Sequence, residues 1–165
     1  MKRLRDVNAM TPERFVETFG DVAEHSPWVA EGAARKRPFD SRQAMIQAFI
    51  ETLHTASPEA QLAVLRAHPD LAGKAKLTAD SSSEQKGVGL NTLNPLEFGR
   101  FTGLNSRYKM RFGFPFIYAV RGATKHQIIQ SFENRINRPA DAELAMALDQ
   151  VCRIISFRLE DRVAP

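Results

Sequence analysis

The stretch FPFIYAV, residues 114–120, decides the fold class of this chain. It is a continuous apolar run, rich in aromatic and β-branched residues and too short to favour a helix, so it predicts a buried extended segment. The sequence on both sides shows helical patterns, and a single extended segment has no partner with which to form a sheet. We therefore predict an all-α fold, a single compact bundle of about seven or eight helices with one buried extended segment near residues 114–120. No linker is visible, so residues 1–165 are expected to form one domain.

Capping residues mark the helix starts on either side of this segment. Thr124 followed three residues later by Gln127 has the pattern of a capping box, and Asn94 with Glu97 repeats it. Thr11 precedes a proline, which is typical of a helix start as well. Apolar residues at spacings of three and four follow each start, and this periodicity indicates amphipathic helices.

Composition argues against several classes of protein. The formal net charge is +4, but the positive residues are interleaved with acidic ones and form no basic stripe of the kind that binds nucleic acid. Cys152 is the single cysteine, so no intrachain disulfide can form and a reducing compartment, by default the cytoplasm, is expected. No apolar stretch approaches the roughly 20 residues of a membrane span. No HxxxH or CxxC pair offers the spacing of a metal site.

The stretch LRAHPDLAGK, residues 65–74, places a histidine directly before a proline where a helix is expected to end. Pro69 disfavours the α region for His68 and makes a rigid bend from which the imidazole projects. Two interpretations stay open. His68 either bonds the last carbonyls of the helix, favoured by the helix dipole, or performs chemistry.

The stretch SSSEQKG, residues 81–87, predicts a short helix that begins near Glu84. A serine-rich helix start presents N–H groups and hydroxyls that can bind the carbonyl or carboxylate oxygens of a ligand. The alternative is structural: the serines cap the helix and Glu84 stabilises its positive end.

Arg158 falls within the apolar stripe of the last expected helix, which runs from about residue 139 to residue 161. It lies seven residues after Val151 and beside Ile154 and Ile155, so helical spacing places its guanidinium on a buried face, where it needs a partner. Its stem either lies on the core while its head reaches solvent, or its planar fork grips an anionic ligand. The same choice applies to residues 116–120, which are either plain core or a non-helical backbone whose polar groups bind a ligand.

Together these pieces resemble a known family. The segments LRAHPDLAGK, SSSEQKGVGL and NSRYKMRFGFPFIYAVRG, followed by a final helix ending FRL, are similar in order and spacing to 2-oxo-4-hydroxy-4-carboxy-5-ureidoimidazoline (OHCU) decarboxylases. The resemblance runs from about Thr11 to Arg162. It implies an all-helical, commonly homodimeric enzyme that needs no cofactor and no metal ion. It also implies the last step from urate to (S)-allantoin.

The resemblance also implies roles for individual residues. His68 matches the catalytic histidine, Glu84 its partner carboxylate and Arg158 a C-terminal arginine with a catalytic or binding part. We expect His68 to act as the proton donor. The positions that match the substrate-lining residues of the family are Pro69, Ser81, Ser82, Ser83, Glu84, Gln85, Phe116, Ile117, Tyr118, Ala119 and Val120.

Two other classes share parts of the pattern. HPD in a loop between helices is also the signature of J-domain co-chaperones, but the helix expected before it, PEAQLAVLRA, contains one arginine where that class has a markedly basic helix. A helical nucleic-acid-binding domain is suggested by the net charge alone. We expect a small-molecule substrate, OHCU, and neither a nucleic acid nor a membrane as partner.

Overall fold

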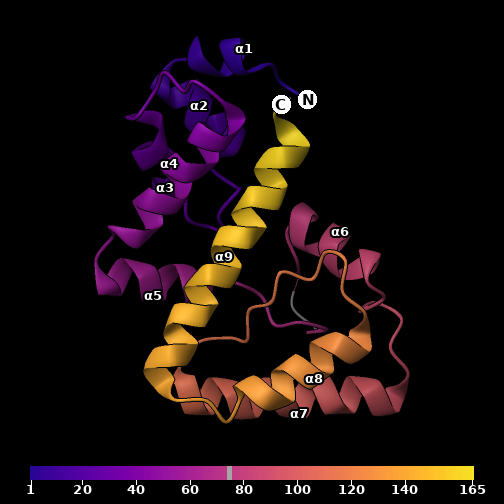
Figure 1. Ribbon diagram of the computed structural model, residues 1–165. Helices are drawn as coiled ribbons and strands as arrows, with labels where there is room; N and C mark the ends of the chain where they lie inside the picture. Colours follow the sequence, from indigo (N-terminus) through magenta and orange to yellow (C-terminus); the bar gives the residue numbers. More distant parts are fainter. Residues whose placement is uncertain (74–75) are drawn as a thin grey trace. The chain divides into compact units, whose positions relative to one another are not determined.

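The computed structural model describes residues 1–73 and 76–165, and over these residues the fold is all-helical (Figure 1). An isolated bridge between Lys2 and Val163 is the one β-type pairing within the described residues. The predicted all-α class is therefore confirmed. The described residues form nine helices: α1 (Leu4–Asn8), α2 (Pro12–Phe19), α3 (Trp28–Ala34), α4 (Arg42–His54), α5 (Pro58–Ala67), α6 (Ala79–Gly87), α7 (Pro95–Phe112), α8 (Lys125–Arg135) and α9 (Ala140–Arg162).

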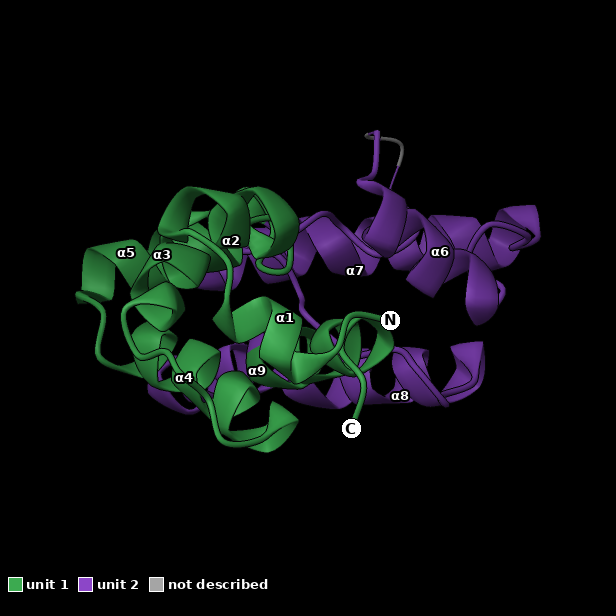
Figure 2. Cartoon of the chain, turned by 90° about the horizontal axis from the view of Figure 1, so that it is seen from above, with its two compact units in different colours: residues 1–67, 152–165 green, residues 68–151 purple. Residues whose placement is uncertain are grey.

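The chain divides into two compact units, coloured green and purple in Figure 2. Unit 1 comprises residues 1–67 and 152–165, and unit 2 comprises residues 68–151. Each unit has an aromatic core of its own. In unit 1, the ring of Phe15 lies 5.0 Å from that of Phe19 and 6.0 Å from that of Phe49, which joins α2 to α4.

In unit 2 the aromatic core joins α7, α8 and the non-helical segment 114–120. Phe116 stacks on Phe132 of α8 with ring centroids 3.8 Å apart, and it makes a T-shaped contact with Tyr108 of α7, with ring centroids 5.4 Å apart. All three side chains are fully buried. Segment 114–120 therefore contributes to the core although it forms no helix, as its continuous apolar sequence predicts.

The capping interactions predicted at two helix starts can be compared with the structure. Thr124 accepts a hydrogen bond from the N–H of Gln127, whose side chain accepts from the N–H of Thr124, so the predicted capping box of α8 is confirmed. Asn94 accepts from the N–H of Glu97 at 2.8 Å, but the return bond differs from expectation. The carboxylate of Glu97 accepts from the side-chain amide of Asn94, not from its backbone.

The start of α6 differs from the prediction. The helix begins at Ala79, five residues before Glu84, and its N-cap is Thr78, whose hydroxyl accepts from the N–H of Ser81 at 3.3 Å. With Asp80 in the first turn as well, Thr78 supplies the favourable cap earlier in the chain than the serines can. Residues 81–83 thus lie inside α6 and are not its cap.

A membrane span was not expected, and none of the helices in residues 1–73 and 76–165 combines the length and apolar character needed to cross a bilayer.

Candidate functional site

The bend after α5 forms as the sequence predicts. Helix α5 ends at Ala67, since Pro69 disfavours a helical conformation of the residue before it. His68 follows directly and is only 8% exposed. The histidine therefore lies in a buried environment at the first residue of unit 2.

Two side chains hold the loop that follows His68 by its backbone. The side-chain carbonyl of Gln85, on α6, accepts from the N–H of Ala72 at 2.9 Å, and its amide donates to the carbonyl of Asp70 at 3.3 Å. From α7, the amide of Asn105 donates to the carbonyl of Leu71 at 2.8 Å. Three successive loop residues are thus bonded to side chains of two helices.

The loop has an unusual backbone conformation and one further anchor. Ala72 has a φ of 55°, in the left-handed region that a residue with a β-carbon seldom occupies. Lys109 of α7 donates to the carboxylate of Asp70 at 2.7 Å. A strained φ persists only where surrounding bonds impose it, and the Gln85 bond to the N–H of Ala72 is one of these.

The predicted site residues of α6 have unequal environments. Ser81 and Gln85 are buried, Ser82 and Ser83 are exposed, and Glu84 is half-buried. A cavity of about 290 Å³ beside the loop has Ser82 and Gln85 in its lining. The structure therefore brings the loop after His68 and the helix carrying Ser81–Gln85 together, with Gln85 as the direct link.

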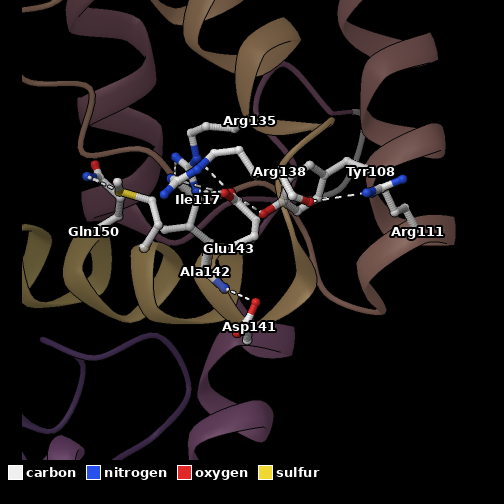
Figure 3. Close-up of polar contacts among 10 residues, drawn as sticks. Tyr108, Arg111, Ile117, Arg135, Arg138, Asp141, Ala142, Glu143 and Gln150 are labelled. Carbon is white, nitrogen blue, oxygen red and sulfur yellow. Dashed lines mark hydrogen bonds and ion pairs between the residues drawn. The ribbon is translucent and has the colours of Figure 1, made fainter.

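Segment 116–120 is fixed by polar contacts from α8 and α9, of which Figure 3 shows the one from Arg135 of α8 to Ile117. Arg135 donates from Nη1 to the carbonyl of Ile117 at 2.7 Å. The side-chain carbonyl of Gln150 accepts from the N–H of Ala119 at 2.9 Å. Two of the predicted substrate-lining residues thus have a backbone group engaged within the protein.

Arg135 is itself held by a buried carboxylate. Glu143, with no exposed surface, accepts from Nε of Arg135 at 2.6 Å and from the hydroxyl of Tyr108 at 2.6 Å. Arg138 lies 3.6 Å from the second carboxylate oxygen of Glu143. Figure 3 shows these side chains converging on Glu143 from α7, α8 and the loop before α9. Buried charges that are paired and hydrogen-bonded in this way keep one geometry.

Tyr108 is a buried titratable group of this cluster, and its pKa is displaced. Burial raises the pKa of Tyr108 far above its usual range, and the hydrogen bond to Glu143 raises it further. The phenol therefore stays protonated and donates to Glu143 over the physiological pH range.

Both predicted site segments of unit 2 are anchored on the same turn of α7. Asn105 bonds the loop at Leu71, and Tyr108, three residues on, packs against Phe116. Residues three apart on a helix lie on one face. Helix α7 thus fixes both segments relative to each other inside unit 2.

Arg158 belongs to unit 1, where it is 3% exposed. Its Nη2 donates to the carboxylate of Glu24 at 2.9 Å, and its Nη1 donates to the carbonyl of Val22 at 3.1 Å. The interpretation in which the guanidinium reaches solvent is therefore wrong. The guanidinium is buried with a carboxylate, itself 1% exposed, as its partner.

Sequence reasoning missed the polar residues that support these segments: Glu24, Asn105, Arg135, Glu143 and Gln150. One signal was available on α9. Glu143, Ala147, Gln150 and Arg158 lie at spacings of four, seven and fifteen residues from the first, so the face that singled out Arg158 also contains Gln150 and Glu143. Their partners come from other elements and have no such signal.

The described residues include no group of three or more His, Cys, Asp or Glu side chains placed to hold a metal ion. The predicted site residues of unit 2 supply an imidazole, a carboxylate, hydroxyls and backbone amides. This set can bind a polar small molecule and transfer a proton.

Comparison with known proteins gives one consistent answer. A family model described as OHCU decarboxylase matches residues 8–160. The 2-oxo-4-hydroxy-4-carboxy-5-ureidoimidazoline decarboxylase of Halalkalicoccus jeotgali is 41% identical over 162 residues, which cover 98% of this chain and 92% of that protein. The uric acid degradation bifunctional protein of Bacillus sp. is 38% identical over 161 residues, 98% of this chain but 32% of that protein.

Among solved structures, (S)-allantoin synthase superposes with a TM-score of 0.81 at 28% identity. The match covers 98% of this chain and 54% of that one, so this chain spans about half of the allantoin synthase. Because the family match spans most of the chain and the sequence relatives exceed 30% identity over nearly its full length, the chain belongs to the OHCU decarboxylase family.

Proposed function

We propose that this protein decarboxylates OHCU to (S)-allantoin, the last step of urate degradation. The observation that carries the proposal is the family match over residues 8–160, together with relatives named for this reaction and for uric acid degradation. The buried His68 and the anchored loop beside it supply a geometry suited to the chemistry.

The reaction needs no external electron acceptor. The substrate carries a carboxylate on a ring carbon that also bears a hydroxyl and adjoins a C=N bond. When the bond to the carboxylate breaks, CO2 leaves and its electron pair forms a C=C bond, while the imine nitrogen takes up a proton. The hydroxyl then loses its proton to become a ring carbonyl, and the neighbouring carbon gains a proton. One proton is consumed per turnover, and we propose that no cofactor takes part.

His68 is the proposed donor of the proton to carbon. Its burial limits access of water, and delivery from one side of the ring yields one enantiomer. Glu84, half-buried on α6, is the proposed partner that orients the imidazole or stabilises its charged form.

The remaining predicted residues are proposed to bind the substrate. Arg158, which matches the C-terminal arginine of the family, would bind its anionic or carbonyl groups, because the planar guanidinium suits a carboxylate or an imide. Backbone and side-chain groups of the other predicted residues would bind the rest of the substrate. These residues are Pro69, Ser81, Ser82, Ser83, Gln85, Phe116, Ile117, Tyr118, Ala119 and Val120. We also propose a homodimer in the cytoplasm; the single cysteine supports a reducing compartment.

Circular dichroism tests the proposal directly. OHCU is unstable, so it is generated in place from urate with a urate oxidase and a hydroxyisourate hydrolase, and this protein is then added. Rapid growth of the (S)-allantoin signal is expected. Slow formation of optically inactive product at the rate of the protein-free control would contradict the proposed reaction.

A further inference from the structure

We propose that Gln150 and Arg135 are positioning residues, which hold the backbone of segment 116–120 so that the N–H and C=O of Tyr118 meet the substrate. The inference rests on the proposed function and refines it. It assigns the recognition of substrate to one residue of the segment and the shape of the segment to two side chains that do not touch substrate.

The first observation is that the anchored groups flank Tyr118. The carbonyl of Ile117 accepts from Arg135, and the N–H of Ala119 donates to Gln150. In an extended chain the polar groups of residues two apart point to one side, and those of the residue between them point to the other. The two anchors therefore direct the backbone groups of Tyr118 away from α8 and α9.

The second observation is that these groups of Tyr118 are not used inside the protein. Within residues 1–73 and 76–165, neither its N–H nor its C=O makes a hydrogen bond. Its neighbours Ile117 and Ala119 are buried, each 3% exposed, and Tyr118 itself is half-buried. A backbone donor and a backbone acceptor that no group in the described part of the protein engages are available to a ligand.

The third observation is that one of the two anchors, Arg135, is held by contacts of its own. Arg135 is fixed by Glu143 and also lies over the ring of Phe116, with its Cζ 4.4 Å from the ring centroid. Phe116 in turn stacks on Phe132. The residue before Ile117 is thereby locked by packing while Ile117 itself is held by a charge-assisted bond.

The chemistry of the substrate fits this arrangement. Its ureido group and its ring each present an N–H beside a C=O, which is the complement of one backbone amide donor and one carbonyl acceptor. A backbone held in advance binds such an edge without the entropic cost of ordering a loop. Loss of an anchor is therefore expected to weaken substrate binding more than to slow the chemical step.

Gln150→Met tests the inference, because methionine nearly preserves shape and removes the acceptor for Ala119. Gln150→Glu keeps a side-chain oxygen and is the rescue variant. Gln130→Met, at an exposed position of α8, is the matched control. For each protein, KM and kcat are measured with OHCU at a temperature where circular dichroism shows it fully folded. Amide hydrogen exchange is followed at Ala119, and at Tyr118 with and without (S)-allantoin.

We expect Gln150→Met to raise KM about tenfold with a smaller change in kcat. Exchange at Ala119 should accelerate, and (S)-allantoin should slow exchange at Tyr118 in the wild-type protein. Gln150→Glu should restore KM, and Gln130→Met should match wild type. An active wild-type protein whose Gln150→Met variant keeps its KM would overturn the inference and leave the reaction standing. A wild-type protein inactive on OHCU would remove both the reaction and this role, even if Ala119 stayed protected.

Discussion

The side-chain carbonyl of Gln85 lies 2.9 Å from the backbone nitrogen of Ala72 and so ties α6 to the loop that follows His68. The bond reaches a residue in the left-handed region, where the backbone would otherwise relax. Gln85 was expected to line the substrate site. Its amide is already engaged at both ends by Ala72 and Asp70, so the structure gives it a second task, that of holding the loop.

Removal of the hydrogen bond between Gln85 and Ala72 is expected to lower the stability of the protein. Gln85→Leu leaves the N–H of Ala72 buried without its acceptor, and we expect the free energy of unfolding to fall by about 1–3 kcal/mol. Urea denaturation followed by circular dichroism measures the change. Lys86→Ala, at the next and exposed position, is the control and should change stability by less than about 0.5 kcal/mol. Equal stabilities of the Gln85→Leu variant and wild type would show that the loop holds its shape without Gln85.

The Arg158–Glu24 pair separates a structural role from a role in substrate binding. Either Arg158→Met or Glu24→Gln alone leaves one buried charge without its partner, and each is expected to cost about 3–5 kcal/mol of stability. The double variant removes both charges together and should regain most of that stability. Urea denaturation of the four proteins gives the coupling free energy of the pair.

Activity of the same double variant then decides what Arg158 does. If Arg158 binds substrate as we propose, the double variant stays inactive on OHCU although its fold is restored. Recovery of turnover in parallel with stability would mean that Arg158 acts only as the partner of Glu24.

Tyr108 gives a prediction about alkaline pH. Burial keeps its phenol neutral in the folded protein and raises its pKa, whereas the unfolded chain releases this proton near pH 10. The stability that depends on neutral Tyr108 is therefore complete below about pH 10 and is lost as the pH rises above it. In a Tyr118→Phe variant, Tyr108 is the single remaining tyrosine.

Ultraviolet absorbance of phenolate in that variant should therefore appear only together with unfolding, as monitored by far-ultraviolet circular dichroism. Phenolate that forms while the helical signal is still native would show that Tyr108 ionises inside the folded protein. That result would contradict the burial of Tyr108 against Glu143.

Features that depend on neighbouring residues in the chain were predictable. The capping box of Thr124 and Gln127 and the end of α5 before Pro69 each involve residues a few positions apart. The apolar run 114–120 likewise predicts its own burial, because its composition leaves it no polar face. The start of α6 was mistaken because two capping candidates, Thr78 and the serines that follow it, compete locally and the earlier one is used.

Features that depend on distant partners were not predictable from spacing. The periodicity of α9 shows that Arg158 needs a partner, but Glu24 lies 134 residues earlier in the chain. The anchoring of Ile117 and Ala119 was missed for the same reason, since Arg135 and Gln150 lie on two other elements. The individual site roles of His68 and Glu84 remain predictions from family resemblance.

The variant His68→Asn tests the central claim most directly, because asparagine is polar and smaller but cannot deliver a proton at neutral pH. Wild type and variant are added to OHCU generated in place, and the circular dichroism of allantoin is followed together with the far-ultraviolet signal of the protein. We predict a native fold and a fall in turnover of about 10²–10⁴-fold, with the remaining allantoin formed as both enantiomers. A folded His68→Asn variant that still produces (S)-allantoin at the wild-type rate would show that the proton comes from another group.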